Sequence, residues 1–169
     1  MAIIRNNFVR VGALFFVLRG ILNLIISLGG VVNFYKTGPA GMFSMYGETL
    51  KKSQITPALE FASHISLNYS LILFGYGVLA VWMAFHIWKG ARIALWINTV
   101  MLAIADFALI LSLVIPGYVP LEQGLIGPGV TLLGVAFTFF GFRKLDEDNA
   151  LDKVTAGWVP QDRRTRARD

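Results

Sequence analysis

The sequence predicts an all-α integral membrane protein: a bundle of four transmembrane helices, with both termini in the cytoplasm and a long outer loop between the first and second helices. Three observations predict this fold. Of the 169 residues, 56% are hydrophobic and only 15% are charged, whereas a soluble domain carries about 25% charged residues. The apolar residues form blocks of about 20 residues or more, the length that crosses a hydrocarbon core. Positive charges flank these blocks in an alternating pattern.

The four apolar blocks are expected to be helices rather than strands. They are continuous and do not alternate with polar residues, and only helices and closed barrels satisfy every backbone polar group in lipid. We place the spans at about residues 9–33, 60–88, 92–115 and 120–142, within one transmembrane domain over residues 1–144.

The distribution of Lys and Arg predicts the orientation of the bundle. Basic residues precede the first span, lie between the second and third, and follow the fourth: Arg5, Arg10, Lys89, Arg92, Arg143 and Lys144. These positions share one side of a bundle with an even number of spans. Because cytoplasmic loops carry the excess of Lys and Arg, both termini should lie in the cytoplasm, and we expect the plasma (inner) membrane as the location.

Two segments outside the spans are long. Residues 33–56 form the outer loop, and loops of that length are usually functional or are ordered by another element. The loop ends at Thr56 and Pro57, which are typical of an N-cap followed by the first helical position. Residues 145–169 form a polar cytoplasmic tail, which is either solvated or a docking segment anchored by Trp158 and Val159.

An intramembrane polar cluster is the clearest candidate site. Arg19, in the segment VLRGILN, and Asp106 are the two formally charged residues deep within the spans. A lone charge at that depth costs about 2.5–3.5 kcal/mol on insertion scales, and both residues fall near the middle of the membrane, so we predict that they pair. Asn23 lies one helical turn from Arg19. Asn98 and Thr99 add polar groups to the third span.

Three interpretations of this cluster are open. The ion pair fixes the register of the helices without necessarily stabilising them. Alternatively, it lines a polar cavity for a proton, an ion or a small ligand, which is the default hypothesis for ionisable residues in a membrane. In the third interpretation, one of the two charges pairs with a helix of another subunit.

A second polar set lies in the outer half of the second span. Glu60, His64 and Asn68 are spaced i, i+4 and i+8, so they share one helix face. This outer polar face is either the mouth of a cavity leading to the Arg19–Asp106 pair or simply the polar end of a helix that enters water.

Glycines recur every seven residues along the fourth span, at Gly127, Gly134 and Gly141. They create a smooth strip on which another helix can pack closely. The helix that covers the strip belongs either to the same bundle or to a partner. Pro128 predicts a kink or a local unwinding in the outer half of this span.

The residue types argue against several classes of chemistry. The chain has no cysteine, which excludes disulfides and thiolate metal sites. His64 and His86 lie 22 residues apart, about 33 Å along one helix, so they cannot ligate the same metal or haem iron. We predict no metal site, no catalytic residue set in this chain alone, and no nucleic-acid binding, because no basic patch is interleaved with aromatics.

Three functions fit these observations. The first is a non-catalytic accessory or assembly subunit of a larger membrane protein complex. Its partners would be membrane lipids and other membrane protein subunits, or further copies of the chain. The second is a small transporter or channel-like protein that uses the Arg19–Asp106 site. The third is a lipid- or quinone-binding protein; no other cofactor is predicted. The layout resembles that of the DoxX-like group, without a motif that maps residue by residue.

Overall fold

The computed structural model describes residues 6–40, 56–117 and 119–157, and their side chains as far as Leu151. In these ranges every regular element is a helix. The elements are α1 (Asn7–Thr37), α3 (Pro57–Trp88), α4 (Arg92–Leu109), a π-helical turn η2 (Ile110–Val114), the short α5 (Leu121–Gly124) and α6 (Ile126–Gly157). Trp158, Val159 and most of the long outer loop lie outside the described residues.

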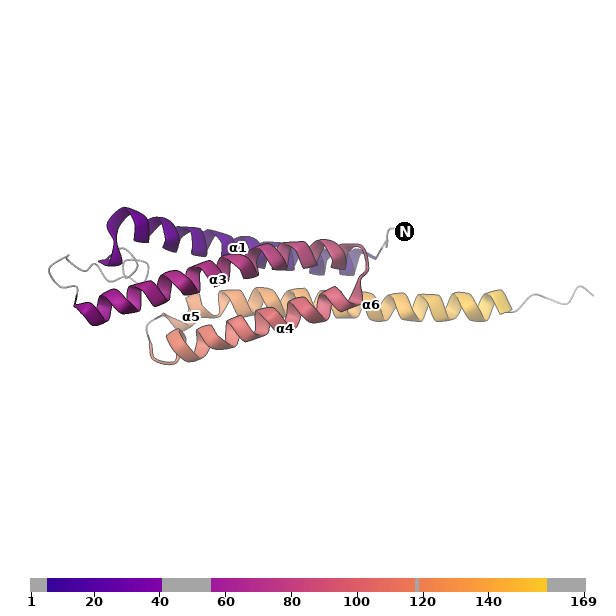
Figure 1. Cartoon of the computed structure of the whole chain (residues 1–169). Helices are drawn as coiled ribbons and strands as arrows, with labels where there is room; N and C mark the ends of the chain where they lie inside the picture. The colour runs from indigo at the N-terminus through magenta and orange to yellow at the C-terminus, as the bar shows by residue number, and fades with distance from the viewer. Residues whose placement is uncertain (1–5, 41–55, 118, 158–169) are drawn as a thin grey trace, which may run out of the picture.

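Four helical segments are long and apolar enough to cross a membrane: Asn7–Thr37, Pro57–Trp88, Arg92–Val114 and Leu121–Leu151. They run up and down in a bundle, with α1 and α3 above α4 and α6 in the view of Figure 1. α1 packs along α3 and α6, and α4 packs against the same two helices. α1 and α4 therefore face each other diagonally across the bundle axis.

The starts of two helices show how local sequence sets the helix boundaries. Thr56 caps α3, because its Oγ1 accepts a hydrogen bond from the backbone N–H of Leu59 at 3.3 Å, and Pro57 is the first helical residue. Both features agree with the sequence prediction. Asn6 caps α1 by accepting from the N–H of Phe8 at 2.9 Å, and its Nδ2 also donates to the carbonyl oxygen of Gly141 at 2.8 Å. One side chain thus starts α1 and ties it to α6.

The last two spans differ in detail from simple helices. The third span ends in the π-helical turn Ile110–Val114, which no hydrophobic pattern indicates. The fourth span is interrupted at Leu125, between α5 and α6. Pro128 lies close to this break and lacks the N–H that a continuous helix would use, so the predicted local unwinding is present.

α6 extends past the apolar block, which ends near residue 142, and continues to Gly157. Figure 1 shows its last turns projecting beyond the ends of the other helices. Hydropathy falls at this point, but helix-forming residues continue. An i,i+4 contact from Arg143 Nε to Glu147 Oε1 at 3.2 Å and an ion pair between Arg92 and Asp146 support the first turns outside the bundle.

The bundle is apolar outside and partly polar inside. Large apolar side chains on the outer surface are widely exposed, including Ile25 at 62%, Phe107 at 63% and Leu132 at 69%. The buried polar and charged residues are Arg19, Asn23, Ser27, Ser63, Ser70, Asn98, Asp106, Thr131 and Thr138. This distribution suits a protein surrounded by hydrocarbon, where outer apolar groups meet lipid and polar groups are sheltered within the bundle.

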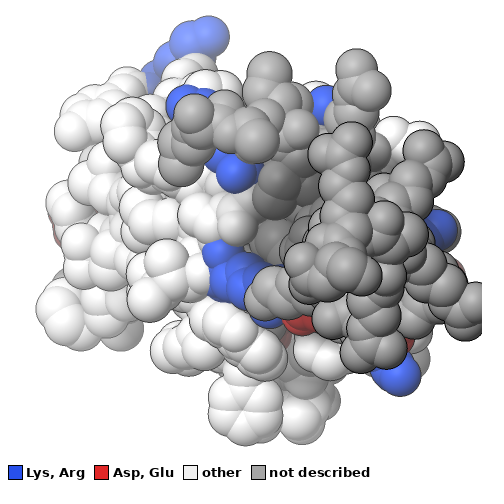
Figure 2. Space-filling model, turned by 90° about the vertical axis from the view of Figure 1, so that its right-hand side faces the viewer, with Lys and Arg blue, Asp and Glu red and all other residues white. Residues whose placement is uncertain are grey.

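Basic residues collect at the end of the bundle where α1 begins, α3 turns into α4 and α6 projects. Figure 2 views this end and shows several Lys and Arg side chains there. Three of them lie over aromatic rings: Arg10 over Trp88, Lys89 over Phe85 and Arg92 over Phe142, at 5.5, 4.1 and 5.2 Å from the ring centroids. We call this the basic end of the bundle.

Candidate functional site

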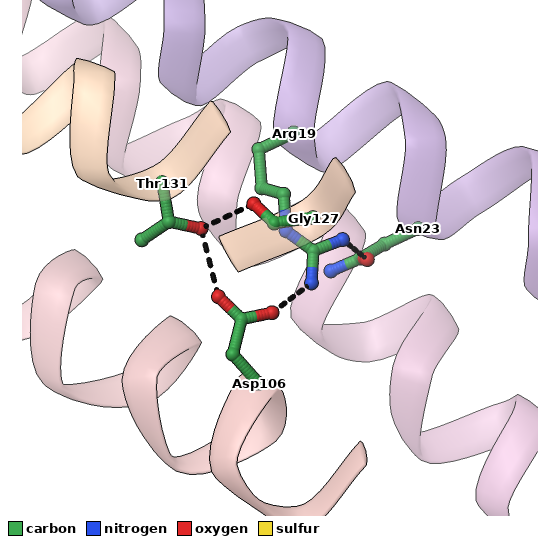
Figure 3. A network of polar contacts seen from close by, with 5 residues as sticks. All are labelled: Arg19, Asn23, Asp106, Gly127 and Thr131. Atoms are coloured by element: carbon green, nitrogen blue, oxygen red, sulfur yellow. Dashed lines mark hydrogen bonds and ion pairs between the residues drawn. The ribbon is translucent and has the colours of Figure 1, made fainter. Parts of the chain in front are cut away.

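The guanidinium of Arg19 reaches from α1 across the bundle axis to the carboxylate of Asp106 on α4 (Figure 3). Both residues are almost completely buried, with 4% and 5% exposure. Nη2 of Arg19 donates to Oδ1 of Asp106. Because α1 and α4 are diagonal rather than adjacent, the long side chain of Arg19 connects two helices that do not pack against each other.

Two further side chains complete the network. Nη1 of Arg19 donates to Oδ1 of Asn23, one turn further along α1. Thr131 on α6 contributes its hydroxyl, whose Oγ1 lies 2.9 Å from Oδ2 of Asp106 and 3.1 Å from the carbonyl oxygen of Gly127. Both carboxylate oxygens therefore have a donor, and the network joins three of the four long helices.

Gly127 makes room for the charged group. A Cβ atom built on this glycine would lie 2.9 Å from both Cζ and Nη2 of Arg19, closer than nonbonded atoms can approach. The guanidinium thus lies directly against the backbone of α6 (Figure 3). The glycine strip therefore has a specific role at this position: it admits the arginine head group to the bundle axis.

Asn98 and Thr99 do not join this network. Asn98 is fully buried on α4, yet within the described residues neither its amide nitrogen nor its amide oxygen has a hydrogen-bond partner. The same holds for Oγ1 of Thr99, Nδ2 of Asn23 and Nε of Arg19. Asn98 and Thr99 lie about two helical turns from Asp106 along α4, which places them away from the Arg19–Asp106 pair.

The outer polar face lies on the outside of α3. The side chains of Glu60, His64 and Asn68 are exposed, and the ring of His64 contacts Phe34 of α1 edge-on, with 5.1 Å between ring centroids. The side of α3 that faces the bundle in this half carries Ser63 and Ser70 instead. The three predicted residues therefore do not point toward the Arg19–Asp106 pair.

The other two glycines of the strip pack against α1. A Cβ on Gly134 would lie 3.3 Å from the ring of Phe16, and one on Gly141 would lie 2.6 Å from the backbone nitrogen of Val9. The strip is thus covered by a helix of the same chain. The sequence left open whether the strip packs within the bundle or against a partner, and the structure shows packing within the bundle.

A second row of small residues lies on α3 and was not predicted from the sequence. Ser63, Ser70, Gly77 and Ala84 also recur every seven residues, and all four are buried. At the centre of this row Gly77 meets Gly20 of α1, where an added Cβ would lie about 2.9 Å from the opposing carbonyl oxygen. The row mixes serine and alanine with glycine, so a search for small residues at a spacing of seven would have found it.

Within the described residues no group of three or more His, Asp or Glu side chains is placed to hold a metal ion. The site at the bundle axis consists of the Arg19–Asp106 ion pair, with hydrogen bonds to the hydroxyl of Thr131 and the amide of Asn23. No protein-family model, no curated protein and no solved structure matches this chain.

Proposed function

We propose that this protein is a non-catalytic accessory subunit that binds another membrane protein through the projecting end of α6. The observation that carries the proposal is the continuation of α6 to Gly157, beyond the bundle. We call residues 147–157 the α6 arm. Most of the stability of helices in proteins comes from tertiary packing, and the described side chains of the arm are exposed. A partner would cover the exposed side chains of residues 147–151.

The interior of the bundle gives less support to the other two functions. A transport site needs a charge that a solute can reach. Here both oxygens of Asp106 are occupied by Arg19 and Thr131, and Gly127 closes one side of the guanidinium. This arrangement favours the structural interpretation, in which the pair fixes how α1, α4 and α6 fit together. A quinone or lipid site between the first three spans has no supporting contact in the described residues.

The orientation is part of the proposal. Because Lys and Arg gather at the basic end, we infer that this end and both termini are cytoplasmic. The arm would then meet its partner on the cytoplasmic side of the plasma (inner) membrane. The chain lacks cysteine, so single cysteines can report the orientation. Asn149→Cys should react with an impermeant thiol reagent only after the cells are opened, and Glu122→Cys should react in intact cells. The reverse pattern would overturn the orientation.

Truncation of the arm tests the accessory role. The protein would be tagged at its N-terminus and extracted in a gentle detergent, and the mass of the intact particle would be measured by mass spectrometry. We expect the full chain to run in a particle of fixed stoichiometry with a second membrane protein. A chain ending at Asp148 should lose that partner, because most of the arm is gone, while the four-helix bundle keeps its melting temperature.

A chain ending at Gly157 is the matched control. It retains all of α6, so it should keep the partner. If the full chain and both truncated chains run as the same lone monomer or dimer, the accessory role is wrong. If the Asp148 truncation keeps its partner at full stoichiometry, docking through the arm is wrong.

A further inference from the structure

An open groove of about 600 Å³ lies between the start of α1 and α6 at the basic end. Its floor is aromatic: Phe8 from α1, and Phe137 and Phe140 from α6. The ring of Phe137 is stacked on Phe8 and on Phe15, with centroid distances of 6.3 and 5.6 Å. The floor is therefore a fixed apolar surface, and its volume falls in the range of small-molecule sites.

The side chains that line the groove change from apolar to cationic to anionic along α6. The apolar residues Phe137 and Phe140 come first, then the cations Arg143 and Lys144, and then Glu147 and Asp148. Each step is about one helical turn, or about 5 Å. Since α6 leaves the apolar block at this level, the order runs from hydrocarbon toward water.

A zwitterionic phospholipid has the complementary order. Its acyl chains are apolar, its phosphate is negative, and its amine is positive and lies furthest into the water. In such a lipid the phosphate would match the level of Arg143 and Lys144, and the amine would match the level of Glu147 and Asp148, one turn further along α6. Arg143 donates one N–H to Glu147, at 3.2 Å. The other N–H groups of its guanidinium are available to a phosphate.

We propose that this groove binds a phospholipid with a primary ammonium head group, of the phosphatidylethanolamine class. The acyl chains lie on Phe137 and Phe140, the phosphate contacts Arg143 and Lys144, and the ammonium donates hydrogen bonds to Glu147 and Asp148. A choline head group has the same charge but no N–H to donate, so the carboxylates distinguish the two.

A neighbouring hollow of about 340 Å³ shares Phe8, Lys144 and Asp148 with the groove. It is also lined by Asn6, whose side chain caps α1 and bonds to Gly141, and by Asn7. The site rests on the groove and its charges and does not depend on the accessory role of the α6 arm.

Lipid competition tests the proposal. The full chain would be stripped of lipid in detergent and then offered equal amounts of phosphatidylethanolamine, phosphatidylcholine and phosphatidylglycerol with identical acyl chains. Retained lipid would be counted by native mass spectrometry. We expect phosphatidylethanolamine to be retained about twofold to fivefold over phosphatidylcholine, which lies within the range that a solvent-exposed ion pair contributes. The double variant Glu147→Gln/Asp148→Asn should reduce this ratio to about one.

Asp146→Asn is the control, because it removes one carboxylate from the same part of α6 but not from the groove. Asp146 pairs with Arg92 and does not line the groove. It should leave the preference unchanged. Lys144→Gln should lower retention of all three lipids. Equal retention of the three lipids by the full chain, or a preference for phosphatidylglycerol, overturns the proposal. An unchanged ratio in the double variant overturns it as well.

Discussion

Arg19→Ala is expected to destabilise the bundle more than any other single truncation of a polar side chain. The substitution leaves the carboxylate of Asp106 buried with only the Thr131 hydroxyl as a donor. Removing one member of a buried ion pair typically costs about 3–5 kcal/mol. We expect a loss of that order in the free energy of unfolding, measured by titrating detergent-solubilised protein with SDS and following helix content.

A double-mutant cycle separates the pair from its surroundings. Arg19→Ala/Asp106→Ala should recover part of the stability lost in Arg19→Ala, because neither charge is then stranded. Arg143→Ala is the control, since its ion pair with Glu147 is exposed and such pairs contribute only about 0.3–0.5 kcal/mol. If the double variant is no more stable than Arg19→Ala, the two residues are not coupled.

The second large effect is expected from Gly12→Ala, at the contact between α1 and α6. A Cβ on Gly12 would lie 2.1 Å from Oγ1 of Thr138, 2.7 Å from the Thr138 backbone nitrogen and 2.9 Å from the carbonyl oxygen of Gly134. Two of these atoms belong to the backbone, so a rotamer change cannot relieve the clash and the helices must separate. We expect a loss of about 1–3 kcal/mol, as for other overpacked sites, measured by the same SDS titration.

Gly75→Ala is the matched control for the glycine substitution. Gly75 is also helical, but an added Cβ meets nothing within 4 Å. Alanine is the better helix former by up to about 1 kcal/mol, so this variant should be as stable as the parent or slightly more stable. Equal losses in the two variants would show that the close approach of α1 to α6 does not determine stability.

The four helices follow from hydropathy alone, because apolar blocks of membrane length leave few alternatives. Arg19 and Asp106 are brought together as expected, since two charges at one depth have few other partners. The support from Thr131 was not predictable. A threonine in a membrane helix can satisfy its hydroxyl on its own backbone, as Thr138 does with Gly134 at 2.7 Å. Only the packing of α6 shows which threonine also reaches a carboxylate.

The end of the fourth helix was harder to place for a different reason. Hydropathy reports where the membrane ends, whereas helix propensity and side-chain pairs decide where the helix ends. Between residue 142 and Gly157 these two boundaries separate. Similarly, the face of α3 that is buried could not be inferred from Glu60, His64 and Asn68. Their regular spacing is also that of a surface stripe, and the buried side chains in this half of α3 are Ser63 and Ser70.

The diagonal ion pair also imposes an order on biosynthesis. Arg19 and Asp106 are 87 residues apart in the chain, and α1 leaves the ribosome long before α4. At 5–20 residues per second the interval is on the order of ten seconds. During this time Arg19 lacks the carboxylate of Asp106 with which it pairs in the bundle, so its head group must be held by other groups, such as the insertion machinery, lipid phosphates or water. α1 can pack along α3 as soon as α3 is made, but the ion pair and the final assembly of the bundle wait for α4 and α6.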